Sequence, residues 1–175
     1  MNGIVIGNII NNDSTNETNN YGNAKVRYIS RRIELADGQD AEDIMVYLNA
    51  FKPHGTDIKV YAKILNAEDT DFESKDFTLL KQNTALSRFS EGFDGSDIRE
   101  FEYTFESDDA SGFLNSNDNN QAKLNNDNSG IVAYRSSEGS IFNGYKTFSI
   151  KIVTTSQSTA LVPLIDDLRV IALQK

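Results

Sequence analysis

Short runs in which every second residue is apolar constrain the fold of this chain more than any other feature. The pattern is clearest over residues 44–51, 58–64 and 101–105. A period of two is that of a β-strand, because successive side chains point to opposite faces of a sheet. The chain has 19 Asn residues, nearly all of them outside the runs, and Asn, Gly and Asp favour turns; no long stretch has helical periodicity. The sequence therefore predicts an all-β, antiparallel protein.

Seven or eight strands are expected, and they predict a β-sandwich, with a jelly roll as one arrangement that fits. The expected strands cover residues 26–35, 44–51, 58–64, 77–80, 101–105, 131–134, 145–153 and 168–173. Both faces of 44–51 are apolar, so we expect a central strand covered on each side, whereas 58–64 is expected to be half-buried. The turn at 52–56 predicts a hairpin between these two, and Asn143-Gly144 predicts a second tight turn.

The chain of 175 residues is long enough for one domain and a short appendage. We expect the sandwich domain to cover residues 24–175 and residues 1–23 to form an extended N-terminal segment or linker. The Asn-rich run 11–20 buries too little apolar area to order itself, and 115–128 is expected to be an exposed loop. Ile4-Val5-Ile6 and Ile9-Ile10 are the exception, because they can pair with a neighbouring chain or an earlier domain.

Composition disfavours most catalytic chemistry. The chain has no Cys and one histidine, His54, which excludes thiol catalysis, disulfides, cysteine–zinc sites and paired-histidine chemistry. The sequence contains no nucleophile-elbow, phosphate-loop or dinucleotide motif. We therefore expect no enzyme, no catalytic residue, no cofactor and no metal. A net charge of −9 disfavours nucleic acid as a partner, and the lack of a long apolar stretch disfavours membrane insertion.

Acidic clusters are compatible with calcium binding or with sugar cleavage, but an ordinary structural interpretation is favoured for each. The D-G-x-D stretches Asp37–Asp40 and Asp94–Asp97 suit a calcium loop, although an Asx turn in which Gly supplies positive φ is favoured. Paired carboxylates at 42–43, 108–109 and 166–167 suit a glycosidase, although solvated surface is favoured for acidic residues this abundant.

Basic and aromatic residues leave an interaction role open. Ion pairs between chains and ion pairs within the domain are equally compatible with five arginines: Arg27, Arg31, Arg32, Arg135 and Arg169. Stacking on sugars is possible for seven tyrosines, although packing within strands is the default: Tyr21, Tyr28, Tyr47, Tyr61, Tyr103, Tyr134 and Tyr145. His54 lies between Pro53 and Gly55, so we expect an exposed turn position.

Two segments carry a resemblance to a known module. The first is 27–41, which continues into 46–61; the second is 145–154, followed by 161–173. Together they resemble a module of virion structural proteins from T4-like and marine tailed bacteriophages, found in baseplate, tail or fibre-associated chains. The likeness covers roughly residues 24–66 and 145–174. It implies a structural role and no catalytic residues.

The resemblance makes a non-enzymatic virion structural protein the leading hypothesis, acting through assembly contacts in a baseplate or tail. Its partners would be other phage structural proteins, with an oligomeric state in the particle, and folding would occur in the bacterial host cytoplasm before incorporation into the virion. The alternative is a host-surface carbohydrate-binding module, which predicts an exposed aromatic cluster and a host glycan as ligand. A third hypothesis, a polysaccharide-cleaving enzyme, predicts a cleft with two facing carboxylates.

Overall fold

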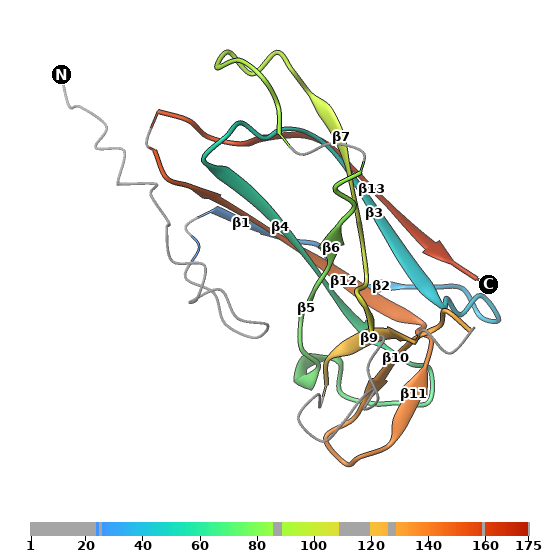
Figure 1. The fold of residues 1–175 in the computed structure, drawn as a ribbon. Helices are drawn as coiled ribbons and strands as arrows, with labels where there is room; N and C mark the ends of the chain where they lie inside the picture. The colour runs from blue at the N-terminus through green and yellow to red at the C-terminus, as the bar shows by residue number, and fades with distance from the viewer. Residues whose placement is uncertain are drawn as a thin grey trace.

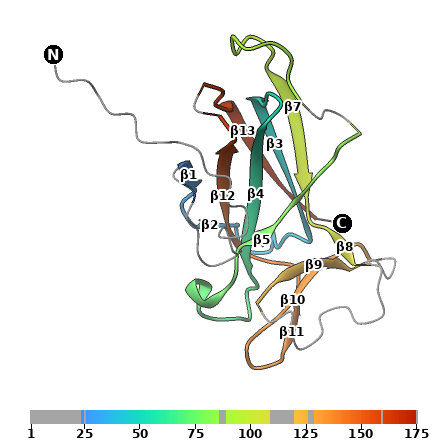
Figure 2. The ribbon, with the colours of Figure 1, turned by 60° about the vertical axis from the view of Figure 1, so that its left-hand side comes forward.

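Two sheets of long strands face each other and enclose the core, and a small sheet lies at one end (Figure 1, Figure 2). The computed structural model describes residues 24, 26–85, 89–108, 120–125, 129–158 and 160–174. Within these residues the strands are mostly antiparallel and the one helical element is the 3₁₀ turn η2 (Phe72–Ser74). The predicted all-β sandwich is therefore confirmed. The predicted N-terminal extension, residues 1–23, lies outside the described residues.

The first sheet has the order β1-β12-β4-β5, and β2 also pairs with β12. Its strands are β1 (Val26–Ile29), β2 (Ile33–Glu34), β4 (Thr56–Leu65), β5 (Thr78–Leu79) and β12 (Thr147–Ser156). The longest ladder joins β4 to β12, from Thr56 opposite Ser156 to Leu65 opposite Thr147. This ladder forms the middle of the first sheet.

The second sheet has the order β13-β3-β7-β6. Its strands are β3 (Asp43–Phe51), β6 (Lys81–Gln82), β7 (Arg99–Thr104) and β13 (Leu164–Leu173). The small sheet has the order β11-β10-β9-β8. Its strands are β8 (Ser107–Asp108), β9 (Ala122–Asn125), β10 (Val132–Arg135) and β11 (Ile141–Asn143). The expectation of a loop throughout 115–128 is therefore wrong for β9, whose Ala122 is buried.

The core lies between the two large sheets and consists of the predicted alternating residues. Ile44, Val46 and Leu48 on β3 are fully buried, and they face residues such as Val60 and Ile150 of the first sheet. The aromatic rings of β7 pack among them. Burial on this scale is the main source of stability in a chain that has no cysteine to form a disulfide.

One side of the sandwich is closed by a strand that changes sheets. β5 pairs with β4, the Leu80 amide donates to the Val60 carbonyl at 2.8 Å, and β6 then pairs with β7. Leu80 is 3% exposed and lies in the core. We call the segment from Asn66 to Gln82 the closed side. It joins the first sheet to the second by backbone hydrogen bonds.

Two predicted turns differ from the structure. β3 and β4 do not form a hairpin, because the turn at Pro53–Thr56 carries the chain from the second sheet to the first. Asn143-Gly144 does not join two paired strands either: the β10–β11 hairpin turns at residues 136–140. Gly144 has φ of 68°, and a Cβ there would lie 2.8 Å from the Ala41 carbonyl oxygen, so this glycine permits a close crossing of two backbones.

The predicted burial of the outer faces of β3 and β4 is also reversed: the sequence predicts that β3 is covered on both faces and β4 on one, and the structure shows the opposite. β3 is central, as expected, but Met45, Tyr47 and Asn49 on its outer face are only half-buried. On β4 the residues expected to face solvent include Tyr61 and Lys63, and both are buried. Phe72 and Phe77 of the closed side lie against Lys63, which explains part of this coverage.

Candidate interaction surface

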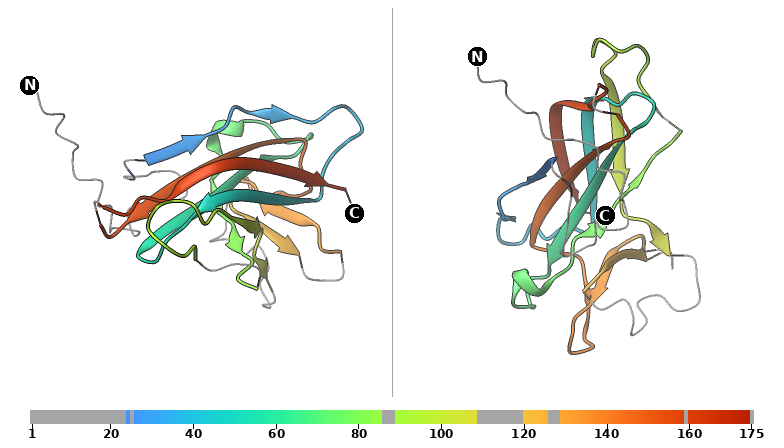
Figure 3. Two further views of the ribbon diagram at one scale, coloured as in Figure 1. Left: turned by 90° about the horizontal axis from the view of Figure 1, so that it is seen from above. Right: turned by 90° about the vertical axis from the view of Figure 1, so that its left-hand side faces the viewer.

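The side opposite the closed side leaves two strand edges apart. β1 and β2 end the first sheet and β13 ends the second, and no described ladder joins them. Figure 3, seen from above, shows blue β1 and β2 and red β13 along this same side. We call it the open side. Between its edges lies a cleft of about 290 Å³, lined by Tyr28, Ile152 and residues 165–168.

Exposed apolar side chains gather on the open side. Six of the eleven large apolar residues that are exposed in the described part of the chain belong to β1 or β13. They are Val26 (45% exposed), Tyr28 (52%), Ile29 (50%), Leu164 (50%), Ile165 (38%) and Ile171 (42%). Single exposed apolar residues are ordinary, but a concentration along two strand edges is typical of an interaction surface.

β13 is a long edge strand with limited protection. It pairs with β3 through a register that shifts at Asp166, which marks a β-bulge. Bulges and charged residues protect sheet edges from unwanted pairing, and here both lie in the first half of the strand. The second half, Leu168–Leu173, carries one charged residue, Arg169, whose guanidinium pairs with Glu100 and lies 5.3 Å from the Tyr47 ring centroid. The strand predicted from the sequence starts at residue 168, so the prediction misses the portion of β13 that lines the cleft.

The structure places the predicted carboxylate pairs apart from one another. Asp43 is buried and its Oδ1 accepts from the Ile44 amide at 2.8 Å. Asp166 and Asp167 line the open-side cleft beside apolar residues. Asp109 lies outside the described residues. Of the described carboxylates in these pairs, only Asp166 and Asp167 line the open-side cleft.

Both D-G-x-D stretches form turns with local partners. Asp37 pairs with Lys146, and Gly38 has φ of 74°. Asp94 accepts from the Ser96 amide at 3.1 Å and hydroxyl at 2.7 Å, which lowers the pKa of its carboxyl. Within the described ranges no group of three or more potential ligand side chains is placed to hold a metal. The Asx-turn interpretation fits these contacts.

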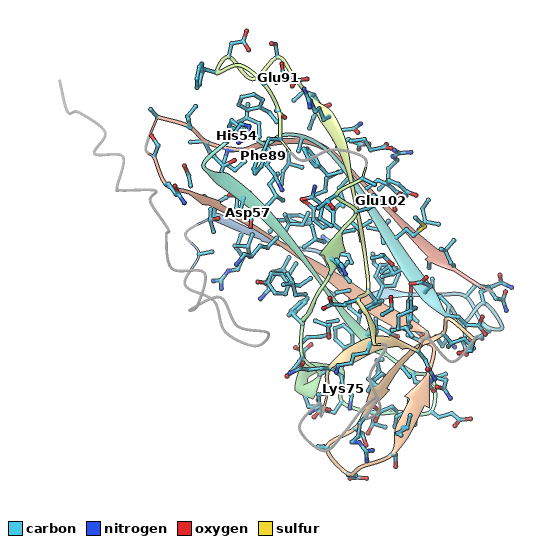
Figure 4. All side chains as sticks on the ribbon, viewed as in Figure 1. His54, Asp57, Lys75, Phe89, Glu91 and Glu102 are labelled. Carbon is cyan, nitrogen blue, oxygen red and sulfur yellow. The ribbon has the colours of Figure 1, made fainter. Side chains whose placement is uncertain are left out.

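The predicted arginines, tyrosines and histidine divide between surface and core. Arg32 lies over the Phe72 ring, Arg135 donates to the Gly139 carbonyl and Arg169 pairs with Glu100, so these three make contacts within the domain. The buried tyrosines are Tyr61, Tyr103, Tyr134 and Tyr145. Tyr28, by contrast, is half exposed at the cleft, and Tyr21 lies outside the described residues. The predicted exposure of His54 is confirmed. The centroid of its ring lies 4.2 Å from that of the Phe89 ring, and both side chains are labelled in Figure 4.

Four buried lysines are a feature that the sequence did not reveal. They are Lys52, Lys63, Lys75 and Lys151, each no more than 7% exposed. Every one has its ammonium within 6 Å of an aromatic ring centroid, where the ring face attracts a cation. Lys75 also pairs with Asp69 at 2.8 Å.

Comparisons with protein-family models, with curated proteins and with solved structures gave no match to this chain. No helix in the described ranges is both long enough and apolar enough to cross a membrane. The open side offers an extended strand edge above an apolar cleft, which suits a protein partner better than a small polar ligand.

Proposed function

We propose that this chain is a non-enzymatic structural protein of a tailed-phage virion, a baseplate or tail component that acts through protein–protein assembly contacts. The open side is the observation that carries the proposal. An apolar cleft beside a ten-residue edge strand is a docking template for another chain. The resemblance of residues 24–66 and 145–174 to a phage virion module supports the same role.

The carboxylates of the described cleft support a role without catalysis. Asp166 and Asp167 are neighbours on one strand, and the cleft's other side chains are Tyr28, Ile152, Ile165 and Leu168. A glycosidase requires two carboxyl groups that face each other across a sugar, at about 5–10 Å. Adjacent residues at a bulge on one strand do not provide that arrangement. The cleft instead provides apolar area for a partner to bury.

The experiment is co-assembly of the full chain with tail and baseplate proteins of a T4-like phage, followed by sedimentation velocity. We expect stable complexes that Ile165→Asp weakens, because it places a charge in the cleft. Ile141→Asp is the matched control: Ile141 is 51% exposed on β11, away from the open side. A monodisperse monomer that binds none of these components would overturn the proposal.

A second candidate, a carbohydrate-binding module, is favoured by one observation. Phe93 is 84% exposed in the loop before β7, and it lines a shallow pocket with Glu91 and Asp97. An exposed ring beside carboxylates is a common platform for a sugar. A glycan array tests this candidate: binding that Phe93→Ala abolishes would support it, and silence across the array would oppose it.

A further inference from the structure

We propose that residues 4–10 of a second copy of this chain add a strand to the edge of β13 that no described strand occupies. The inference rests on the proposed function, since it names the partner that the open side takes in assembly. It joins one feature of the structure and one of the sequence. The first is the edge of β13, which pairs with no strand but β3 among the described residues, together with its cleft; the second is the apolar sequence Ile4–Ile10.

The acceptor is the edge of β13 together with the apolar floor of the cleft. An added strand gains backbone hydrogen bonds from the edge, and its alternate side chains enter the pocket beneath. Ile165 and Leu168 of β13 and Tyr28 of β1 line that pocket. Ile152 of β12 also lines it and is 3% exposed. The side chains that best fill such a pocket are aliphatic and β-branched.

The donor has this composition and carries no charge. Five of the seven residues in Ile4-Val5-Ile6-Gly7-Asn8-Ile9-Ile10 are Ile or Val. The first charged side chain of the chain is Asp13. Two copies with a net charge of −9 each repel one another, and the cleft carries Asp166 and Asp167. An uncharged donor is the kind of segment that can enter this cleft without adding to that repulsion.

The direction from which the chain enters β1 favours a second copy over the donor's own cleft. Ala24 packs against Tyr61 and Val153. Val153 alternates with the core residue Ile152, so it lies on the outer face of the first sheet, whereas the cleft opens on the inner face beside Ile152. Residues 11–23 extended span on the order of 40 Å, enough to reach a neighbouring molecule. Such head-to-tail contacts form rings or filaments.

Disulfide trapping tests the pairing directly, because the chain has no cysteine of its own. Two full-length chains are mixed, one with Ile6→Cys and one with Ile165→Cys, the second enlarged by a tag so that the heterodimer has a distinct mass. We expect mild oxidation to give the heterodimer in preference to either homodimer. Ile6→Cys mixed with Ile141→Cys is the matched control and should give at least tenfold less. Equal yields in the two mixtures would overturn the proposal.

The double variant Ile6→Cys/Ile165→Cys distinguishes the two sources of the strand. At low protein concentration, an intramolecular disulfide in a monomer would assign the strand to the same chain and overturn the second-copy proposal. Disulfide-linked oligomers that grow with concentration would support it.

Sedimentation of Ile6→Asp and Ile165→Asp separates this inference from the proposed function. We expect each substitution to weaken self-association at least tenfold, with the circular dichroism spectrum unchanged. If Ile165→Asp weakens assembly with phage proteins and Ile6→Asp has no effect on self-association, the donor assignment fails while the proposed function stands. If the unmodified chain associates with neither itself nor tail components, both fail.

Discussion

The closed and open sides of the sandwich depart from the usual distribution of residues in opposite ways: the closed side buries charged residues, and the open side exposes apolar ones. On and beside the closed side, Lys52, Lys63 and Lys75 are buried against aromatic rings. On the open side, Ile165 and Ile171 are exposed. Lysine is among the residues least often buried and isoleucine among the most often. Each side therefore departs from the usual distribution, in opposite directions.

The difference shows which side is complete within one molecule. A buried ammonium is tolerated only where local groups replace its water, and the closed side supplies rings, a carboxylate and an amide: the Lys52 ammonium donates to the Gln82 side-chain oxygen at 2.6 Å. The open side supplies nothing to cover its isoleucines among the described residues. Folding alone therefore satisfies the buried groups of the closed side, whereas a partner would be needed to cover the apolar residues of the open side.

Breaking the closed side should have the largest effect on stability. Leu80 lies where the chain crosses between sheets and is 3% exposed, so Leu80→Ala removes buried hydrocarbon and leaves a cavity. We expect a loss of about 3 kcal/mol in the free energy of unfolding, measured by urea denaturation. The matched open-side variant, Ile165→Ala, should cost less than about 1 kcal/mol. Equal losses in the free energy of unfolding for the two variants would mean that the open side contributes as much to folding stability as the closed side.

The Asp69–Lys75 pair should give the next largest effect, with a pH dependence of its own. Burial raises the pKa of the Asp69 carboxyl, but hydrogen bonds from Lys75 and the Tyr134 hydroxyl outweigh it and hold that pKa below its ordinary value of 3.8. Asp69→Asn keeps a hydrogen-bond acceptor but leaves the Lys75 ammonium without a counter-charge. We expect the free energy of unfolding to fall by about 2 kcal/mol at pH 7, as for a lost hydrogen bond to a charged group.

The sign of the pH effect follows from the lowered pKa. A carboxyl whose pKa is depressed in the folded state contributes stability that is fully present above its ordinary pKa and is lost as pH falls through the folded value. The stability gap between the unmodified chain and Asp69→Asn should therefore narrow as pH drops below about 4. Urea denaturation at pH 7, 5 and 3 measures it. Asp166→Asn on the open side is the control, and a gap that stayed constant with pH would contradict the assignment.

A ring between two ammonium groups should give a smaller effect. Phe77 lies 4.8 Å from the Lys63 ammonium and 5.2 Å from that of Lys151, and burial lowers the pKa of Lys63. Phe77→Leu keeps apolar bulk and removes the π face, so we expect a loss of about 1 kcal/mol by thermal or urea unfolding. The same substitution at Phe93, which is 84% exposed, should be neutral within about 0.5 kcal/mol.

Alternation in the sequence predicted most strands but not their partners. The period of two along 44–51 and 58–64 assigns inner and outer faces, and the inner residues are the core. It does not say whether the next strand lies in the same sheet. The turn at Pro53–Thr56 connects two sheets here, and nothing local distinguishes it from a hairpin turn.

The buried lysines and the candidate surface were harder to predict, because their signals are non-local. The alternation along 58–64 predicts that Lys63 faces solvent. In the structure Phe72 and Phe77 of the closed side cover it, and this contact is not visible in the local sequence. The first half of β13 follows Pro163 and contains two aspartates, which read as a turn, and pairing with β3 makes it a strand nonetheless. Its edge position depends on the order of the whole sheet.

The open side itself should show the smallest effect on stability. Ile171 is 42% exposed near the end of β13, opposite Met45 of β3, and Ile171→Thr keeps a β-branched side chain while removing exposed hydrocarbon. We expect the free energy of unfolding to stay within about 0.5 kcal/mol. Self-association should nevertheless weaken, since that hydrocarbon is area a partner would bury. Urea denaturation and sedimentation velocity on one sample separate the two effects, because a residue that serves the fold changes both and one that serves assembly changes only the second.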